Sequence, residues 1–166
     1  MDPAAAGGPV LSVHVVGTPK PQGSKRAFVV QAKGGPARAV VVDSSRSPLR
    51  DWRGDVTAAV QRAMDVATPF GWDPVTGPVS VRLVFALPRP ASAPKRRRTW
   101  PTGRVGDIDK LARAVLDSLT DAGVWRDDAQ VVHLEAVKDY PGTAIAQHIP
   151  GVRITVQHVT EERTSP

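Results

Sequence analysis

The feature that most constrains the fold is a change of apolar periodicity in the second half of the chain. Residues 79–85 place apolar side chains mainly at alternate positions, which predicts a strand. Residues 108–119 then repeat apolar side chains every three or four positions, which predicts a helix that begins near Asp107 and ends at Gly123. A strand is predicted again at residues 131–137. A helix between two such strands is expected to cover one face of a sheet.

The remaining segments predict further strands and a second helix. Strands are expected at residues 11–16 and 152–156, and a hairpin is expected at residues 27–31 and 39–42. A serine followed by a proline at position 48 is typical of a helix start, and this helix is expected to end at a proline and a glycine near residue 70. We therefore predict an α+β fold, with a mixed β-sheet covered by two main helices.

One domain is expected, at residues 11–158, between flexible tails at residues 1–10 and 159–166. A proline-containing loop is predicted at residues 17–26, because prolines cannot donate to a strand ladder. A mobile basic loop is predicted at residues 88–104, where prolines flank a run of four cations.

The composition excludes several classes of protein. The chain has 166 residues and no cysteine, which excludes disulfides, thiol catalysis, thiolate zinc sites and iron–sulfur clusters. No apolar run approaches the roughly 20 residues that span a bilayer, and the first residues do not resemble a signal peptide. We expect a soluble, cytoplasmic protein without a membrane partner. The formal net charge of +6 favours a polyanionic partner.

Acidic residues cluster around the second predicted helix. Asp109, Arg113 and Asp117 share its polar face, and Asp107 lies at its start. An Asp-Asp pair ending at Asp128 follows the helix. Carboxylates brought within about 4 Å of one another need a cation or a shifted pKa, and Mg²⁺ prefers such oxygen ligands. The ordinary alternative is that the first acids suit the helix dipole, that the pair forms a turn, and that Asp117 is a surface acid or a partner of Arg113.

Other catalytic templates are missing from the sequence. There is no G-x-S-x-G elbow, no P-loop and no G-x-G-x-x-G, so no nucleotide cofactor is expected. The four histidines lack paired ligand spacing, and His14 and His133 are expected to be structural residues of strands.

Two groups of cations are candidate phosphate contacts. The candidate DNA-binding residues lie in the two predicted loops: Lys20, Lys25, Arg26, Lys95, Arg96, Arg97 and Arg98. Such contacts add affinity through counterion release without reading sequence. Trp100 could stack on a base or sugar, or it could pack within its loop. A basic run that is simply solvated remains the alternative.

The acidic segments resemble a known family when they are taken together. The likeness rests on three spaced blocks: Asp107-Ile108-Asp109-Lys110-Leu111, then Val115-Leu116-Asp117-Ser118-Leu119, then Gly123-Val124-Trp125-Arg126-Asp127-Asp128-Ala129-Gln130-Val131-Val132. They resemble the RusA family of Holliday junction resolvases, whose pattern is D-x-D-N-x-x-K, an internal D-x-L and a D-D-x-Q-V turn. Residues 17–26 resemble the family's N-terminal stretch, and Lys138 matches a lysine often seen after the acidic turn.

The resemblance implies a bacterial or phage-encoded homodimer that cuts branched DNA (four-way junctions) with Mg²⁺, for which Mn²⁺ can substitute. By position it assigns Asp107, Asp109 and Asp128 as metal ligands. The family's essential lysine falls at Arg113 and its asparagine at Lys110. Arginine keeps the charge but cannot release a proton, so Arg113, or Lys110 one turn earlier, is expected to stabilise the transition state.

The sequence therefore predicts a metal-dependent, structure-selective endonuclease. Lys138 is a further candidate DNA contact. Two alternatives remain open: a non-catalytic or weakly active module that binds junctions or duplexes and retains the fold, and a metal-dependent phosphatase or nuclease acting on simpler substrates.

Overall fold

The structure is a computed structural model of the chain. It describes residues 9–23, 25–30, 38–43, 46–68, 70–94, 97–102 and 106–159. Within residues 25–30 and 38–43 and at Arg46, the backbone alone is described.

A four-stranded mixed sheet forms the centre of the molecule. Its strands are β1 (Leu11–Val16), β4 (Val79–Ala86), β5 (Val131–Asp139) and β6 (Gly151–His158), in the order β1-β6-β4-β5. The β1–β6 and β6–β4 pairs are antiparallel, and the β4–β5 pair is parallel. The predicted mixed sheet is confirmed, and β4, β5 and β6 are one to three residues longer than predicted.

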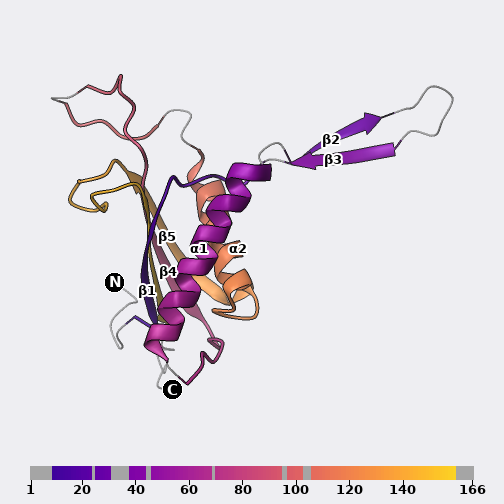
Figure 1. The fold of residues 1–166 in the computed structure, drawn as a ribbon, viewed down its shortest axis with the longest axis vertical. Coiled ribbons are helices and arrows are strands. Elements are labelled where there is room, and N and C mark those ends of the chain that lie inside the picture. Colours follow the sequence, from indigo (N-terminus) through magenta and orange to yellow (C-terminus); the bar gives the residue numbers. More distant parts are fainter. Residues whose placement is uncertain are drawn as a thin grey trace, which may run out of the picture.

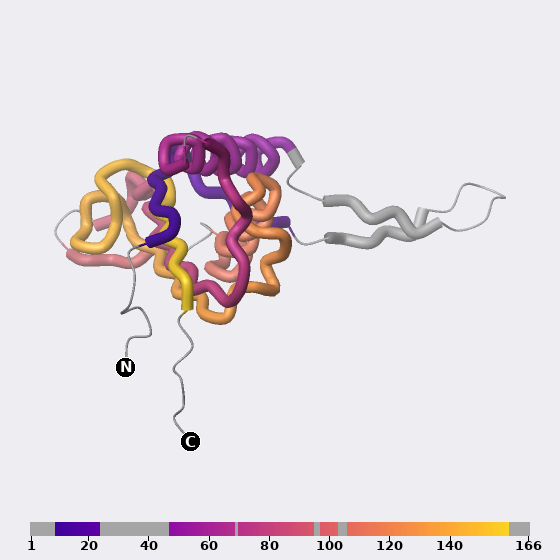
Figure 2. Tube along the Cα trace, turned by 90° about the horizontal axis from the view of Figure 1, so that it is seen from below, coloured from indigo at the N-terminus to yellow at the C-terminus, as the bar shows by residue number. Residues whose placement is uncertain are grey.

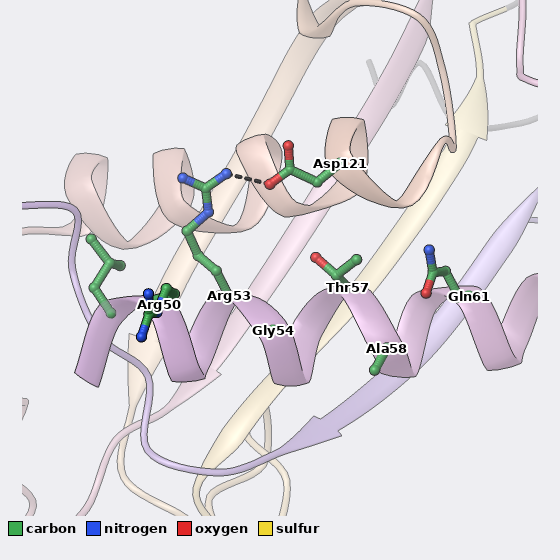
Figure 3. A pocket seen from close by; sticks show the side chains of 8 residues that line it. Arg50, Arg53, Gly54, Thr57, Ala58, Gln61 and Asp121 are labelled. Carbon is green, nitrogen blue, oxygen red and sulfur yellow. Dashed lines mark hydrogen bonds and ion pairs between the residues drawn. The ribbon is translucent and has the colours of Figure 1, made fainter. Parts of the chain in front are cut away.

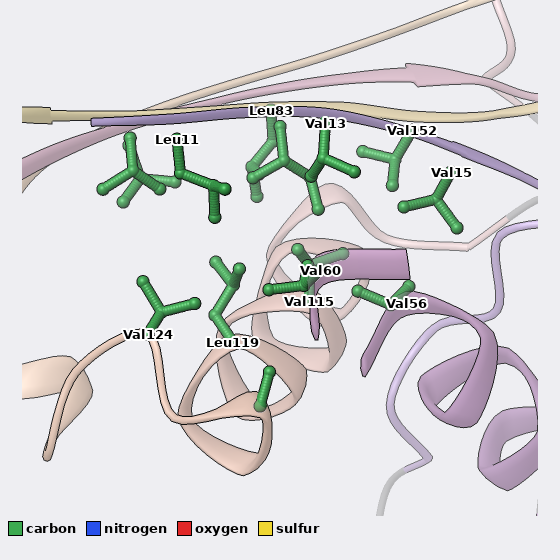
Figure 4. Close-up of a cluster of buried hydrophobic side chains, with 14 of the residues drawn as sticks. Leu11, Val13, Val15, Val56, Val60, Leu83, Val115, Leu119, Val124 and Val152 are labelled. Carbon is green, nitrogen blue, oxygen red and sulfur yellow. The ribbon is translucent and has the colours of Figure 1, made fainter. Parts of the chain in front are cut away.

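Two helices cover one face of this sheet (Figure 1). They are α1 (Arg46–Ala67) and α2 (Ile108–Ala122), and a short 3-10 helix, η1 (Asp128–Gln130), follows α2. Figure 4 shows valines and leucines of the sheet facing Val56 and Val60 of α1 and Val115 and Leu119 of α2. These side chains are fully buried or nearly so, so the predicted apolar stripes do form the core.

The β4–α2–β5 segment is a parallel crossover, and it gives the molecule two distinct ends. Because β4 and β5 run in the same direction, α2 must return against them. The upper end, at the top of Figure 1, holds the finish of β4 and β5, the start of α2 and the loop that begins at residue 88. The lower end holds the finish of α2, η1 and the start of β5. Residues that precede and follow α2 therefore lie at opposite ends.

The predicted hairpin is present with different bounds. Its strands are β2 (Lys25–Val30) and β3 (Arg38–Asp43), which form a separate two-stranded antiparallel sheet. Lys25 and Arg26, predicted to lie in a loop, are therefore in a strand backbone. The ladder is formed by backbone N–H and C=O groups, so it can extend beyond the apolar residues that marked the strands.

Backbone pairing also reaches into the segments predicted to be tails. The amide of Val10 donates to the carbonyl of Val156 at 2.8 Å, and the amide of Val159 donates to the carbonyl of Pro78 at 3.0 Å. Figure 2 shows β1 and β6 side by side, and the first of these contacts extends that pairing. Residues 1–8 and 160–166 are outside the described residues. In the described part of the chain, neither helix is long and apolar enough to cross a membrane.

Candidate active site

Asp107 occupies the N-cap position of α2, as the sequence predicts, but its side chain does not cap the helix. The carboxylate instead accepts a hydrogen bond from Lys110 Nζ at 2.7 Å. This ammonium holds the pKa of Asp107 below its ordinary value, and the charge of Lys138 adds a smaller effect in the same direction. The same contact raises the pKa of Lys110 above its ordinary value. Asp107 is therefore kept ionised beside a cation.

Three backbone contacts fix the approach to Asp107. Gly106 has φ +104°, a conformation that side chains rarely adopt, and a Cβ there would lie 3.0 Å from the ring of Pro21. Its carbonyl accepts a hydrogen bond from Lys138 Nζ at 2.9 Å. The amide of Gln22 donates to the carbonyl of Lys110 at 3.0 Å. The loop predicted at residues 17–26, the end of β5 and the start of α2 thus meet at the upper end.

Asp109 and Arg113 lie on α2 one turn apart, and both are exposed. No salt bridge involves Arg113 among the described residues. Asp117 pairs with Arg53 of α1 at 3.5 Å rather than with Arg113, so that local pairing is not formed. Arg53 also binds Asp121, and local patterning does not mark this connection because the partners lie more than 60 residues away along the chain.

Asp128 is not close to Asp107 and Asp109 within one chain. It begins η1 at the lower end, where the side chain of Asp127 accepts a hydrogen bond from the amide of Ala129 at 2.8 Å. The 15 residues of α2 separate the two ends by about 20 Å, at 1.5 Å per residue. In the described ranges, no three acidic or histidine side chains are placed to hold one metal ion. Within one chain the three carboxylates therefore do not meet, because α2 lies between them, and their assignment to one metal ion stays a prediction.

The upper end alone still offers a donor set suited to a divalent ion. Mg²⁺ is usually bound by one or two carboxylates together with waters and substrate phosphates. Asp107 and Asp109 are both exposed carboxylates within the first turn of α2. Lys110 now holds one oxygen of Asp107, so an arriving cation must compete with an ammonium for it.

A second ion pair stands at the same end of the sheet. Arg98 Nη2 donates to Asp139 Oδ2 at 2.7 Å, and the Asp139 side chain is completely buried. The Arg98 guanidinium also lies 4.2 Å from the ring centroid of Trp100. Arg98 was predicted to bind phosphate, whereas here it anchors its loop to the last residue of β5. The sequence did not single out Asp139, because its burial depends on loops that fold over the strand end.

The other predicted DNA contacts differ in exposure and in whether the structure describes them. Lys20 and Lys138 are partly exposed at the upper end, and Arg97 is exposed. Lys95 and Arg96 lie outside the described residues, and the side chains of Lys25 and Arg26 are not described.

A separate groove of the described surface lies away from these residues. It has a volume of roughly 560 Å³ and runs along α1, as Figure 3 shows. Its polar lining includes Arg50, Thr57 and Gln61, and the Arg53–Asp121 pair closes one side. None of the predicted metal ligands lines it.

Of the two histidines expected to be structural, His133 has a side-chain partner. His133 Nδ1 lies 2.9 Å from Ser80 Oγ, which joins β5 to β4, while His14 is exposed on β1.

Comparison with known proteins assigns the family. Residues 18–157 match the family described as Endodeoxyribonuclease RusA, and this is most of the chain. The chain therefore belongs to the RusA family, the class of endodeoxyribonucleases that the acidic helix start and the D-D-x-Q-V turn had indicated.

Individual relatives match over shorter segments. The chain is 35% identical over 88 residues to a crossover junction endodeoxyribonuclease RusA of Shigella sonnei (strain Ss046), which covers 52% of this chain and 57% of the relative. It is 41% identical over 61 residues to proteins of the same name from Escherichia coli (strain K12) and Enterobacteria phage 82. Those matches cover 37% of this chain and 40% of each relative, so the matched segments span about half the length of the relatives or less.

Proposed function

We propose that this protein is a metal-dependent endodeoxyribonuclease that resolves four-way DNA junctions by paired symmetric nicks. One observation carries the proposal: a chain of the RusA family presents two exposed carboxylates, Asp107 and Asp109, in the first turn of α2. Relatives named crossover junction endodeoxyribonucleases support the substrate class.

Asp107 and Asp109 would hold a divalent ion at the upper end. When bound there, Mg²⁺ or Mn²⁺ polarises a phosphate oxygen and lowers the pKa of water. The ammonium of Lys110 lowers the pKa of Asp107 further below its ordinary value, so the carboxylate stays charged even in mild acid. The exposed guanidinium of Arg113, one turn along the same helix, would hold a phosphate oxygen and stabilise its developing charge. Lys138 and Gly106 fix the angle at which the chain enters α2.

In the proposed site, Asp128 would come from a second copy of the chain. Ligand distances for Mg²⁺ are about 2.0–2.1 Å, so a carboxylate about 20 Å away along α2 cannot join the set within one chain. A two-fold homodimer presents the same surface twice, and it can therefore bring the lower end of one copy to the upper end of the other. Such a dimer would have two equivalent sites, which suits two symmetric nicks in a two-fold junction.

A labelled four-way junction and a linear duplex of matched sequence test the proposal. We expect paired nicks in the junction with Mg²⁺ or Mn²⁺, none with EDTA, and little cutting of the duplex. Equal cutting of both DNAs would instead indicate a nuclease with a simpler substrate.

The Lys110–Asp107 contact favours a second candidate, a junction-binding module without catalysis. An ammonium already satisfies the carboxylate there, so the chain could bind DNA with no metal ion. This candidate predicts junction binding in EDTA and no nicks with any divalent ion.

A further inference from the structure

The exposed indole ring of Trp100 packs against a guanidinium that is itself anchored by an ion pair. The Arg98 guanidinium lies over its indole at 4.2 Å from the ring centroid. The same guanidinium donates to Asp139 at 2.7 Å, and this carboxylate is completely buried at the end of β5. The other oxygen of Asp139 accepts the amide of Tyr140 at 2.8 Å. The guanidinium that packs on the ring is therefore fixed to the end of the sheet.

Burial distinguishes Trp100 from tryptophans that serve the core. Trp52 and Trp125 are 3% and 2% exposed, whereas Trp100 is 52% exposed. Its neighbour Pro101 is buried, so the loop is packed at this point while the indole is not. Burying a carboxylate costs free energy unless it is paired, and here the pair supports a ring that remains open to solvent. A ring that served only to pack the loop would not need this support while half of it faces water.

The position of Trp100 relates it to the candidate metal ligands. Lys138 and Asp139 are consecutive residues of β5, and consecutive strand residues point to opposite faces of a sheet. Lys138 donates to Gly106, which directly precedes Asp107, while Asp139 holds the Arg98–Trp100 pair. The ring and the carboxylates are therefore both tied to the same end of β5, the ring through Arg98 and the carboxylates through Gly106.

We propose that the indole of Trp100 is a stacking platform for an unstacked base beside the branch point of the junction. The proposal rests on the proposed function. Bases at a branch point can leave their stack, and an indole offers any of the four bases an aromatic face without reading its sequence. The adjacent guanidinium adds charge attraction for the phosphate of the same nucleotide. Base pairs in an intact duplex remain stacked on one another, so the platform would favour branched DNA over linear DNA.

Binding in EDTA separates the stacking step from cleavage. The probe is a four-way junction with 2-aminopurine beside the branch point, whose fluorescence reports stacking, and a linear duplex carries the same label. We expect Trp100→Ala to bind the junction about tenfold more weakly and to lose the fluorescence change. Trp100→Phe should retain most of both, because the aromatic face remains. Affinity for the linear duplex should not change in either variant.

A matched control and a second variant keep the test decisive. Phe70→Ala removes another fully exposed aromatic side chain, after the C-terminal end of α1, and should leave junction affinity unchanged. Trp100→Leu keeps apolar volume in the loop if Trp100→Ala melts at a lower temperature, and it should bind as weakly as Trp100→Ala.

Unchanged junction affinity and fluorescence in Trp100→Ala would overturn the platform, as would an equal loss of affinity for junction and duplex. Metal-dependent nicking by the unmodified protein is measured on the same junction. Nicking with no effect of Trp100 would reject the platform alone, and binding without nicking would reject the proposed function.

Discussion

The two ends of α2 present opposite arrangements of charge. At the upper end, two exposed carboxylates lie among cations that include Lys110 and Lys138. At the lower end, a small pocket is lined by four acids and two arginines: Arg53, Asp117, Asp121, Arg126, Asp127 and Asp128, together with Thr120. The upper end has cations close to its acids, and the lower end has an excess of acids. Neither end holds all three family carboxylates, and their charges are complementary.

This difference supports the proposed homodimer, in which the two ends would come from different copies. In a two-fold dimer, the acidic lower end of each copy can lie against the cation-bearing upper end of the other, and the contact then occurs twice. Variants at each end of α2 separate the contributions of the two ends.

Removing one upper-end carboxylate should abolish cutting. Asp109→Asn keeps the shape of the side chain but loses the charge that a divalent ion needs, so we expect junction nicking to fall by at least about 100-fold. Junction binding should be equal or tighter, because a negative charge near DNA is lost. Gel-shift and nicking assays on one labelled junction measure both. Retained cutting would remove Asp109 from the ligand set.

Mixing two inactive variants should restore part of the activity if the ends work together across copies. Asp109→Asn and Asp128→Asn should each be inactive alone. A mixed dimer would contain one site with both substitutions and one intact site. Random exchange in an equal mixture should therefore make about a quarter of all sites intact. The product should be single nicks rather than paired ones. If all three carboxylates worked within one chain, the mixture would stay inactive.

Reversing one exposed charge of the basic loop should weaken DNA binding without changing its preference. Arg97 is exposed, whereas its neighbour Arg98 is held by Asp139. Arg97→Glu should lower affinity for junction and duplex alike and reduce the slope of binding against salt by about one. Arg62→Glu makes the same reversal on the exposed side of α1 and should leave the slope unchanged. An unaltered slope in Arg97→Glu would show that this residue does not contact phosphate.

Removing the ammonium beside Asp107 should have the smallest effect. Lys110 and Asp107 are both exposed, and water and salt weaken an exposed ion pair. Lys110→Asn should therefore lower the Mg²⁺ concentration needed for half-maximal nicking by about two- to fivefold, because the cation no longer competes with an ammonium. Arg62→Gln serves as the charge control. A higher Mg²⁺ requirement in Lys110→Asn would indicate that Lys110 assists the reaction instead.

The local pattern of the sequence was sufficient for most of the fold. The stripe at residues 108–119 predicted a helix that begins near Asp107 and ends at Gly123, and α2 has these bounds. The alternating segments predicted the four strands of the central sheet. Prediction was poorer for the bounds of the hairpin, since its strands extend through polar residues that periodicity does not mark.

The candidate site depended far more on contacts between distant segments. Asp107 and Asp109 could be recognised from a short motif, because they share the first turn of one helix. The Arg98–Asp139 pair, the Arg53–Asp117 pair and the hydrogen bond from Lys138 to Gly106 could not, because each joins residues at least 30 positions apart. Spacing along a chain says nothing of such pairs until the sheet order and the helix direction are known.

The sequence by itself determined the family, the fold class and the identity of the three acidic residues, because each is written in local periodicity or in short spaced motifs. Only the tertiary structure decided that α2 keeps Asp128 at the opposite end from Asp107 and Asp109. A straight hydrogen-bonded helix has a fixed rise per residue, so its length sets how far apart its two ends must lie.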